Sequence, residues 1–215
     1  MIRVSKSSNT PQSLLRTKSY GADDVVIQLS QDSHKKCYLC ERVRDTDYNI
    51  EHYKSRENNA ELVQEWSNLF FSCSYCNGKK LHHFDEILNP LTENIEDIIA
   101  QKIDFSHNIA LFSVNTSSPS AGKTIELLNR IYNGTNKMRK HREEELYKYS
   151  KKVVNDFQSM ALQYLLSPTE ALKTAIQEAL QIDKELLGFK YWIIKSNSEL
   201  FSQFENDMIW NRGSI

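Results

Sequence analysis

The chain has 215 residues, of which 40% are hydrophobic and 10% aromatic, and its 27 basic and 28 acidic side chains give a net charge of −1. This hydrophobic content excludes a wholly disordered chain, and the longest apolar run, residues 191–194, is too short to cross a membrane. The balanced charge provides no overall positive field toward a nucleic acid. Only 6 glycines and 4 prolines occur, which favours long helices over an all-β fold with many tight turns.

Residues 1–30 are predicted to form a basic arm followed by a short helix. Arg3, Lys6, Arg16 and Lys18 all precede the first acidic residue, Asp23. An acid-free start of this kind resembles a transit peptide, but a proline interrupts any amphipathic helix in it. No signal-peptide core is recognisable, so we expect the protein in the reducing cytoplasm.

All four cysteines belong to two C-x₂-C pairs, Cys37/Cys40 and Cys73/Cys76. Two such knuckles can place four thiolates around one ion, and zinc prefers a tetrahedral set of sulfur ligands. Buried free cysteines or a redox-active pair are the alternatives, but the paired spacing without a stray cysteine favours zinc. Because four thiolates fill the coordination shell, we expect a structural ion that does no chemistry.

Three short elements are predicted around the cysteines, within residues 31–90. Residues 47–53 alternate loosely, as a half-buried strand does, and residues 68–72 form an apolar run that suits a buried strand. Residues 57–65 between them indicate a loop or a short helix. Residues 74–84 have a helical pattern, so the region is predicted to contain two strands and a helix.

Four polar residues in this region suit the hydrolysis of a phosphodiester, which needs a base to deprotonate water and a hard cation to neutralise the phosphate. His52 can be the base if another group fixes its tautomer, and Asn68 can do so through its side chain or the adjacent backbone carbonyl. Glu51 and Asn77 offer oxygen ligands of the kind that magnesium accepts. Taken singly, each residue has an ordinary structural explanation, and only the combination indicates catalysis.

These motifs resemble a known family. The order C-x₂-C, Glu51-His52, Trp66-x-Asn68-Leu69 and Cys73-x₂-Cys76-Asn77-x₂-Lys80 resembles the HNH, or ββα-metal, endonucleases in their zinc-stabilised form. The strings C-Y-L-C-E, I-E-H-Y-K-S and W-S-N-L-F-F-S-C-S-Y-C-N-G-K-K are most similar to the HNH subunits of Septu-type anti-phage systems, and some retrons contain a similar effector. The similarity extends over about residues 1–150.

The resemblance implies an α+β fold with a zinc-stabilised ββα-metal core at residues 31–90 and a mainly α-helical region after it. It implies structural zinc, catalytic magnesium or manganese, and roles for five residues: general base for His52, orientation of the base for Asn68, metal binding for Glu51 and Asn77, and nucleic-acid contact for Lys80. Many HNH enzymes have a further histidine ligand where this chain has Leu81. Whether His82 or His83 contacts the catalytic metal stays open.

The resemblance also implies partners: an ABC/SMC-like ATPase that regulates the subunit and, in a retron, a reverse transcriptase with its RNA–DNA product. DNA and RNA are equally open as substrates. A zinc-folded adaptor without catalysis is the alternative function, because the two knuckles alone fit both classes. Convergence of His52, Glu51 and Asn77 on one pocket apart from the zinc would favour the enzyme.

Residues 91–215 are predicted to be a mainly helical interaction region. The patterns predict a helix at 92–102, a small hairpin near 105–114, and helices from about residue 123 to the end. Ser167 and Pro168 indicate a helix start, and Gly188 indicates the end of that helix. Basic residues cluster at Lys79 and Lys80, and at Lys137, Arg139, Lys140 and Arg142, and such runs are usually solvated faces. Five aromatic residues indicate either core packing or a docking surface for a partner: Phe189, Trp192, Phe201, Phe204 and Trp210.

Overall fold

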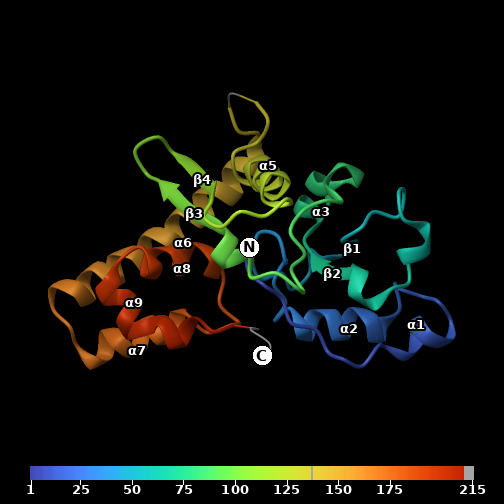
Figure 1. Cartoon of the computed structure of the whole chain (residues 1–215), viewed down its shortest axis with the longest axis horizontal. Coiled ribbons are helices and arrows are strands. Elements are labelled where there is room, and N and C mark those ends of the chain that lie inside the picture. The colour runs from blue at the N-terminus through green and yellow to red at the C-terminus, as the bar shows by residue number, and fades with distance from the viewer. Residues whose placement is uncertain (137, 211–215) are drawn as a thin grey trace.

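Two short helices near the start of the chain pack against a β-hairpin in the computed structural model, which describes residues 1–136 and 138–210. The helices are α1 (Gln12–Arg16) and α2 (Asp23–Asp32), and the antiparallel strands are β1 (Asn49–His52) and β2 (Leu69–Ser72). The register pairs Asn49 with Ser72 and His52 with Leu69. Apolar residues of α1, α2 and β2 form one buried cluster, and Figure 1 shows this unit at one end of the molecule.

The hairpin leads directly into helix α3 (Ser74–Lys80). Cys73 caps the helix, since its sulfur accepts a hydrogen bond from the backbone of Cys76 at 3.4 Å. The helix predicted for 74–84 ends early because Leu81 adopts a positive φ of 51°, and a 3₁₀ turn, His82–Phe84, follows. The order of elements is therefore strand, strand, helix.

The middle of the chain forms a second two-stranded sheet. Helix α4 (Ile95–Ile98) is a single turn, and it is followed by the antiparallel strands β3 (Ile99–Asp104) and β4 (Ile109–Val114) and by helix α5 (Ala121–Tyr132). The prediction of a helix at 92–102 is wrong beyond Ile98. Ile99 and Ile103 instead belong to a strand whose apolar side is buried in the main core.

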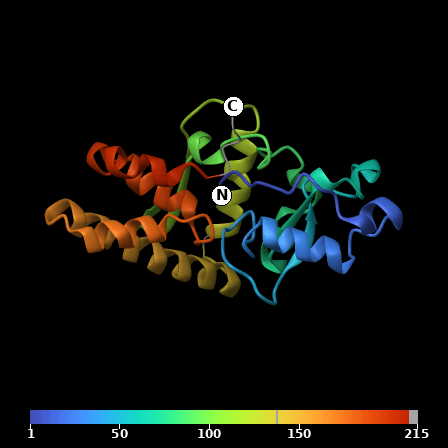
Figure 2. The same ribbon diagram turned by 90° about the horizontal axis from the view of Figure 1, so that it is seen from below.

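Four helices make up the last third of the described chain: α6 (His141–Leu166), α7 (Glu170–Ala179), α8 (Leu187–Lys195) and α9 (Ser198–Phe204), with a 3₁₀ turn, Glu205–Met208, at the end. Thr169, and not Ser167, caps α7 by accepting a hydrogen bond from Leu172 at 3.2 Å. Gly188 does not end that helix, because it lies in the first turn of α8. Figure 2 shows α6 running from the centre of the molecule along this half.

The aromatic residues near the C-terminus pack inside the chain. Phe204 is fully buried, and Phe189, Trp192 and Trp210 are at most 8% exposed. Phe189 belongs to the main core, whereas Phe201 packs against the cluster that contains the other three. The indole of Trp210 donates a hydrogen bond to the carbonyl of Leu180 at 2.6 Å. Core packing is therefore correct for the four buried side chains, and their prediction as a docking surface is wrong.

The first cysteine knuckle is bound to a segment from the far end of the chain. The Lys36 ammonium donates to the carbonyl oxygens of Ile182 and Lys184. The Glu41 carboxylate accepts a hydrogen bond from the backbone of Gly188 at 3.1 Å. These contacts place the knuckle against the start of α8 rather than in a separate unit.

The N-terminal arm lies against the hairpin. The ammonium of Lys6 donates to the carbonyls of Trp66 and Leu69 and lies 3.8 Å from the centre of the Trp66 ring. Burial lowers the pKa of Lys6 to about 7.

Lys137 of the predicted basic cluster, and residues 211–215, lie outside the described residues. Among the described helices, none combines the length and the apolar composition needed to cross a bilayer.

Candidate metal centre and catalytic site

The four cysteines converge between the knuckle loop, the end of β2 and α3. All four sulfur atoms lie within 4.8 Å of one another, and the side chains are fully buried. Four bonds of about 2.3 Å to one zinc ion would place the sulfurs about 3.8 Å apart, and the sulfurs of Cys40 and Cys73 are separated by 4.0 Å. The two predicted knuckles therefore form one cluster that can bind a metal ion, and the donor set fits zinc.

Burial makes this cluster dependent on a cation. Removal from water raises the pKa of the Cys76 thiol well above its usual value, so this thiol keeps its proton when no metal is bound. A divalent ion reverses this preference because it attracts the thiolates and displaces the protons. In the described part of the chain, no second group of three or more His, Cys, Asp or Glu side chains converges in this way.

Glu51 points from β1 into the interior, where it meets two partners. Its carboxylate accepts a hydrogen bond from the Tyr38 hydroxyl at 2.7 Å and lies 3.3 Å from the Lys80 ammonium. Burial raises the pKa of Glu51 to about 7, although the charge of Lys80 opposes that shift. Each carboxylate oxygen can accept a second bond, so Glu51 keeps lone pairs available for a cation.

Lys80 lies inside the protein, with no exposed side-chain surface. Besides Glu51, its ammonium donates to the backbone carbonyl of His52 at 3.0 Å and lies 3.9 Å from Asp85. Its predicted contact with nucleic acid stays a prediction, and the contacts seen are those of a buried counter-ion. Asn77 lies one helical turn before Lys80, on the helix that packs against β1.

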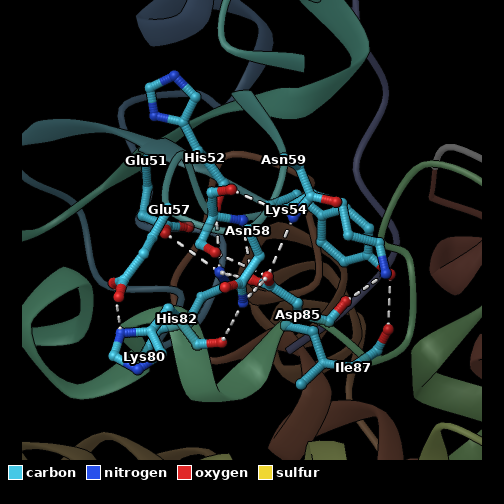
Figure 3. Close-up of polar contacts among 12 residues, drawn as sticks. Glu51, His52, Lys54, Glu57, Asn58, Asn59, Lys80, His82, Asp85 and Ile87 are labelled. Atoms are coloured by element: carbon cyan, nitrogen blue, oxygen red, sulfur yellow. Dashed lines mark hydrogen bonds and ion pairs between the residues drawn. The ribbon is translucent and has the colours of Figure 1, made fainter. Parts of the chain in front are cut away.

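His52 points to the opposite side of the strand from Glu51, as successive strand residues do (Figure 3). Its Nε2 lies 3.0 Å from the carbonyl oxygen of Val63, and the side chain is 6% exposed. A carbonyl only accepts, so Nε2 is the protonated nitrogen and Nδ1 retains the basic lone pair. Burial lowers the pKa of His52, and the charges of Arg56 and Lys80 lower it further, so the imidazole is neutral at pH 7.

Asn68 holds the turn that supplies this carbonyl. Its amide oxygen accepts from the backbone of Lys54 at 2.7 Å, and its amide nitrogen donates to the carbonyls of Lys54 and Leu62 at 3.0 Å each. Leu62 immediately precedes Val63, so the buried Asn68 side chain fixes the position of the group that orients His52. The structure brings His52 and Asn68 together in this indirect way, through the backbone.

The loop after β1 is fixed by Asp85. Its carboxylate accepts from both the backbone and the hydroxyl of Ser55, and from the side-chain amides of Asn58 and Asn59 (Figure 3). His82, a candidate metal ligand by sequence, has its Nδ1 2.8 Å from the carboxylate of Glu57 on the same side of the loop. Glu57 is thus the ion-pair partner that the structure gives to His82.

Several residues around His52 and Glu51 are not predictable from the sequence patterns. The Tyr20 ring packs edge-on against the His52 ring with centroids 4.9 Å apart, and its hydroxyl accepts from Arg56 at 2.7 Å. Arg56 is exposed and forms no ion pair with a carboxylate of the described chain. Tyr38 lies between the cysteines of the first knuckle, but its role toward Glu51 is a tertiary contact that no local pattern reveals.

The fold and the site define a mixed α+β protein, about half helical, with a buried four-cysteine centre beside a polar cluster. No family model matches the chain. A stretch of 80 residues is 32% identical to the Septu protein PtuB of Bacillus thuringiensis. This match covers 34% of the chain and 31% of the relative, so the chain spans about a third of the relative's length.

Proposed function

We propose that the chain is a metal-dependent endonuclease of the HNH, or ββα-metal, type that hydrolyses phosphodiester bonds of DNA or RNA. The main support is the state of His52: its Nε2 is bound to the Val63 carbonyl, so a neutral imidazole keeps Nδ1 as a base. A hydrolase that deprotonates water near neutral pH needs such a group. A histidine bonded to a backbone carbonyl also occurs as an ordinary structural residue, so the proposal depends on His52 together with Glu51, Asn68 and Asn77.

In this proposal His52 Nδ1 accepts the proton of the attacking water, and the water oxygen forms the new bond to phosphorus. The bond to the leaving oxygen then breaks, and that oxygen takes a proton from solvent. Arg56 lies beside the base, and no carboxylate of the described chain neutralises its guanidinium, so it is better placed than the buried Lys80 to contact the phosphate. Asn68 and Val63 keep the imidazole in position throughout.

Two metals belong to the proposal. The four cysteines hold structural zinc. Glu51 and Asn77 would hold magnesium or manganese, which would supply positive charge to a phosphate and its leaving oxygen. The convergence of His52 and Glu51 expected from the sequence is not seen, because the two side chains leave β1 on opposite sides. Lys80 keeps the buried Glu51 carboxylate charge-balanced without the ion, and the nearby Asp85 offers this ammonium a second carboxylate when the ion binds.

The partial likeness to a Septu protein supports a place in anti-phage defence. We propose that the chain is the nuclease subunit of a defence complex in the cytoplasm, regulated by an ABC/SMC-like ATPase. In a retron, the complex would also contain a reverse transcriptase and its RNA–DNA product. With a near-zero net charge, the chain has little long-range attraction for nucleic acid, which suits capture of substrate by a partner.

The test is cleavage of labelled single- and double-stranded DNA and RNA by the purified chain, alone and with co-expressed neighbouring proteins. We expect cleavage with magnesium, none with calcium, and a loss of about 10²- to 10⁴-fold in rate for His52→Ala. Zinc content, measured by elemental analysis, should be the same in both proteins.

Absence of cleavage under all these conditions, in protein that retains zinc and binds its partners, would replace the proposal with the zinc-folded adaptor. Cleavage by His52→Ala at the wild-type rate would instead retain the nuclease and reject the base.

A further inference from the structure

A second polar site lies on the zinc side of the hairpin, apart from His52. A pocket of about 350 Å³ opens between the loop after the first knuckle, the start of α3 and the start of α6. Its charged and polar lining includes Arg42, Arg44, Asp47, Ser74, Arg142 and Glu145. The two loop arginines are about 100 residues distant from the helix arginine in sequence, so only the fold brings the three together.

The three arginines differ in their surroundings: burial lowers the pKa of Arg44, but the nearby sulfurs of Cys40 and Cys73 and the carboxylate of Asp47 raise it overall. None of them forms an ion pair with a carboxylate of the described chain. The Nε atoms of Arg42 and Arg44 are buried and lack a hydrogen-bond partner. A buried donor without a partner loses its bond to water, so these guanidinium groups have hydrogen-bonding capacity that the protein does not use.

The two carboxylates of the pocket already have partners. Asp47 accepts a hydrogen bond from the Ser74 hydroxyl, and Glu145 lies 3.9 Å from the ammonium of Lys148. The guanidinium of Arg42 is fixed by stacking on the ring of Tyr149 at 3.9 Å. A rigid, unpaired guanidinium loses little entropy when it binds an anion, which distinguishes this pocket from a solvated charged face.

We propose that this pocket binds a phosphate group of the nucleic-acid strand that the chain cuts. The planar forks of arginine match the geometry of phosphate oxygens. Asp47 of the pocket lies two residues before the start of β1, and His52 ends that strand, whose ends are three residue steps, or about 10 Å, apart. A strand laid along the hairpin reaches both sites, and the pocket thereby positions the scissile bond.

The inference rests on the proposed nuclease function only for the identity of the anion. The phosphate could belong to a nucleic-acid backbone or to a free nucleotide, and both have the same chemistry toward the arginines. The continuity with β1 favours the backbone. An acidic protein segment is the competing class of ligand, since its carboxylates also fit guanidinium groups.

The test is binding of a short fluorescent oligonucleotide to the full chain, followed by anisotropy at low and at physiological salt. All proteins contain His52→Ala, so that the probe stays intact and binding is measured separately from cleavage. Arg42→Gln combined with Arg142→Gln removes two pocket charges. Lys173→Gln, on the distant helix α7, removes one charge outside the pocket and serves as the control.

We expect the double variant to bind about 10-fold more weakly, with the slope of log affinity against log salt reduced by about 0.7 for each phosphate that is no longer neutralised. The control should stay within about twofold of the parent protein. Competition by a free nucleoside triphosphate that disappears in the double variant would assign the pocket to free nucleotides. Competition by polyglutamate as effective as that by oligonucleotide would overturn the proposal in favour of an acidic protein.

Unchanged affinity and salt slope in the double variant would also overturn it. If Arg42→Gln disturbs the fold through loss of its stacking on Tyr149, Arg142→Gln alone decides, because Arg142 is exposed and its removal leaves the core intact. A failure of the wild-type chain to cleave in the separate cleavage assay, together with normal binding here, would reject the nuclease and leave the phosphate site standing.

Discussion

Asn68→Ala is expected to destabilise the protein and to release His52 from its fixed tautomer. The Asn68 side chain is 4% exposed and makes three hydrogen bonds, one with the backbone of Leu62 and two with that of Lys54. At about 1 kcal/mol for each bond, the free energy of unfolding should fall by about 3 kcal/mol. Without the bond to Leu62 the adjacent Val63 carbonyl is free to move, so the proton of His52 should no longer be confined to Nε2.

Asn68→Asp separates hydrogen bonding from packing. The introduced carboxyl can still accept from Lys54, but in its charged form it faces the carbonyl oxygens of Lys54 and Leu62. Protonation supplies a donor to one of them, so the folded-state pKa of this carboxyl should lie above its unfolded value of about 3.9. The stability that this protonated carboxyl contributes to the folded protein is therefore fully present below the unfolded-state pKa. That contribution is lost as the pH rises through the folded-state pKa.

Urea denaturation at several pH values measures both effects, and nitrogen chemical shifts of the imidazole report the tautomer of His52. Asn58→Ala is the matched control, because that exposed amide contacts the same loop through His82 and Asp85 and should cost about 0.5 kcal/mol or less. A loss below about 1 kcal/mol in Asn68→Ala, with unaltered nitrogen shifts, would refute the positioning role.

Four further predictions concern the metals, the base and the core. Cys73→Ser should lose zinc and unfold or aggregate, and elemental analysis should find one zinc per wild-type chain and none in the variant. The rate of cleavage should rise with pH as His52 loses its proton, with a midpoint below 6.5 because burial lowers its pKa; a midpoint at or above 6.5 would contradict the assignment. Asn77→Ala should raise the magnesium concentration needed for cleavage or abolish cleavage. An unchanged magnesium dependence would show that Asn77 is not a metal ligand. Phe204→Ala should lower the free energy of unfolding by about 3 to 5 kcal/mol, as measured by denaturation, because the side chain is fully buried. A loss near zero would show that Phe204 is not part of the core.

The local patterns predict those features that depend on spacing. Two C-x₂-C pairs lead to one cluster, because each two-residue spacer brings its sulfurs to the same point. The hairpin strands lie within about two residues of their expected ends, since alternation and apolar runs mark buried backbone. The expected helix at 92–102 is wrong because pairing between β3 and β4 outweighs the local pattern.

The environment of each site residue could not be predicted, because it depends on contacts between distant segments. Lys80 follows Asn77 as a surface helix residue would, but the hairpin and Asp85 enclose its ammonium. The group that holds His52 is a backbone carbonyl, Val63, which has no signature in the side-chain sequence. The tail aromatics look excessive for a short helix because their partners on α6 and α7 lie outside any local window.

The bonds between the first knuckle and the start of α8 have a consequence for synthesis on the ribosome. Lys36 emerges 146 residues before the Ile182 carbonyl that accepts from it, and Glu41 emerges 147 residues before Gly188. A nascent chain therefore exposes all four cysteines long before Lys36 meets its acceptor, and until then Glu41 has the N-terminal ammonium of Met1 as its partner but not Gly188. Until the last helices are made, the surface of the first knuckle around Lys36 and Glu41 stays exposed to water, and the complete protein buries it. Prematurely terminated chains would retain that exposed surface, which gives cellular proteases a means to distinguish them from complete ones.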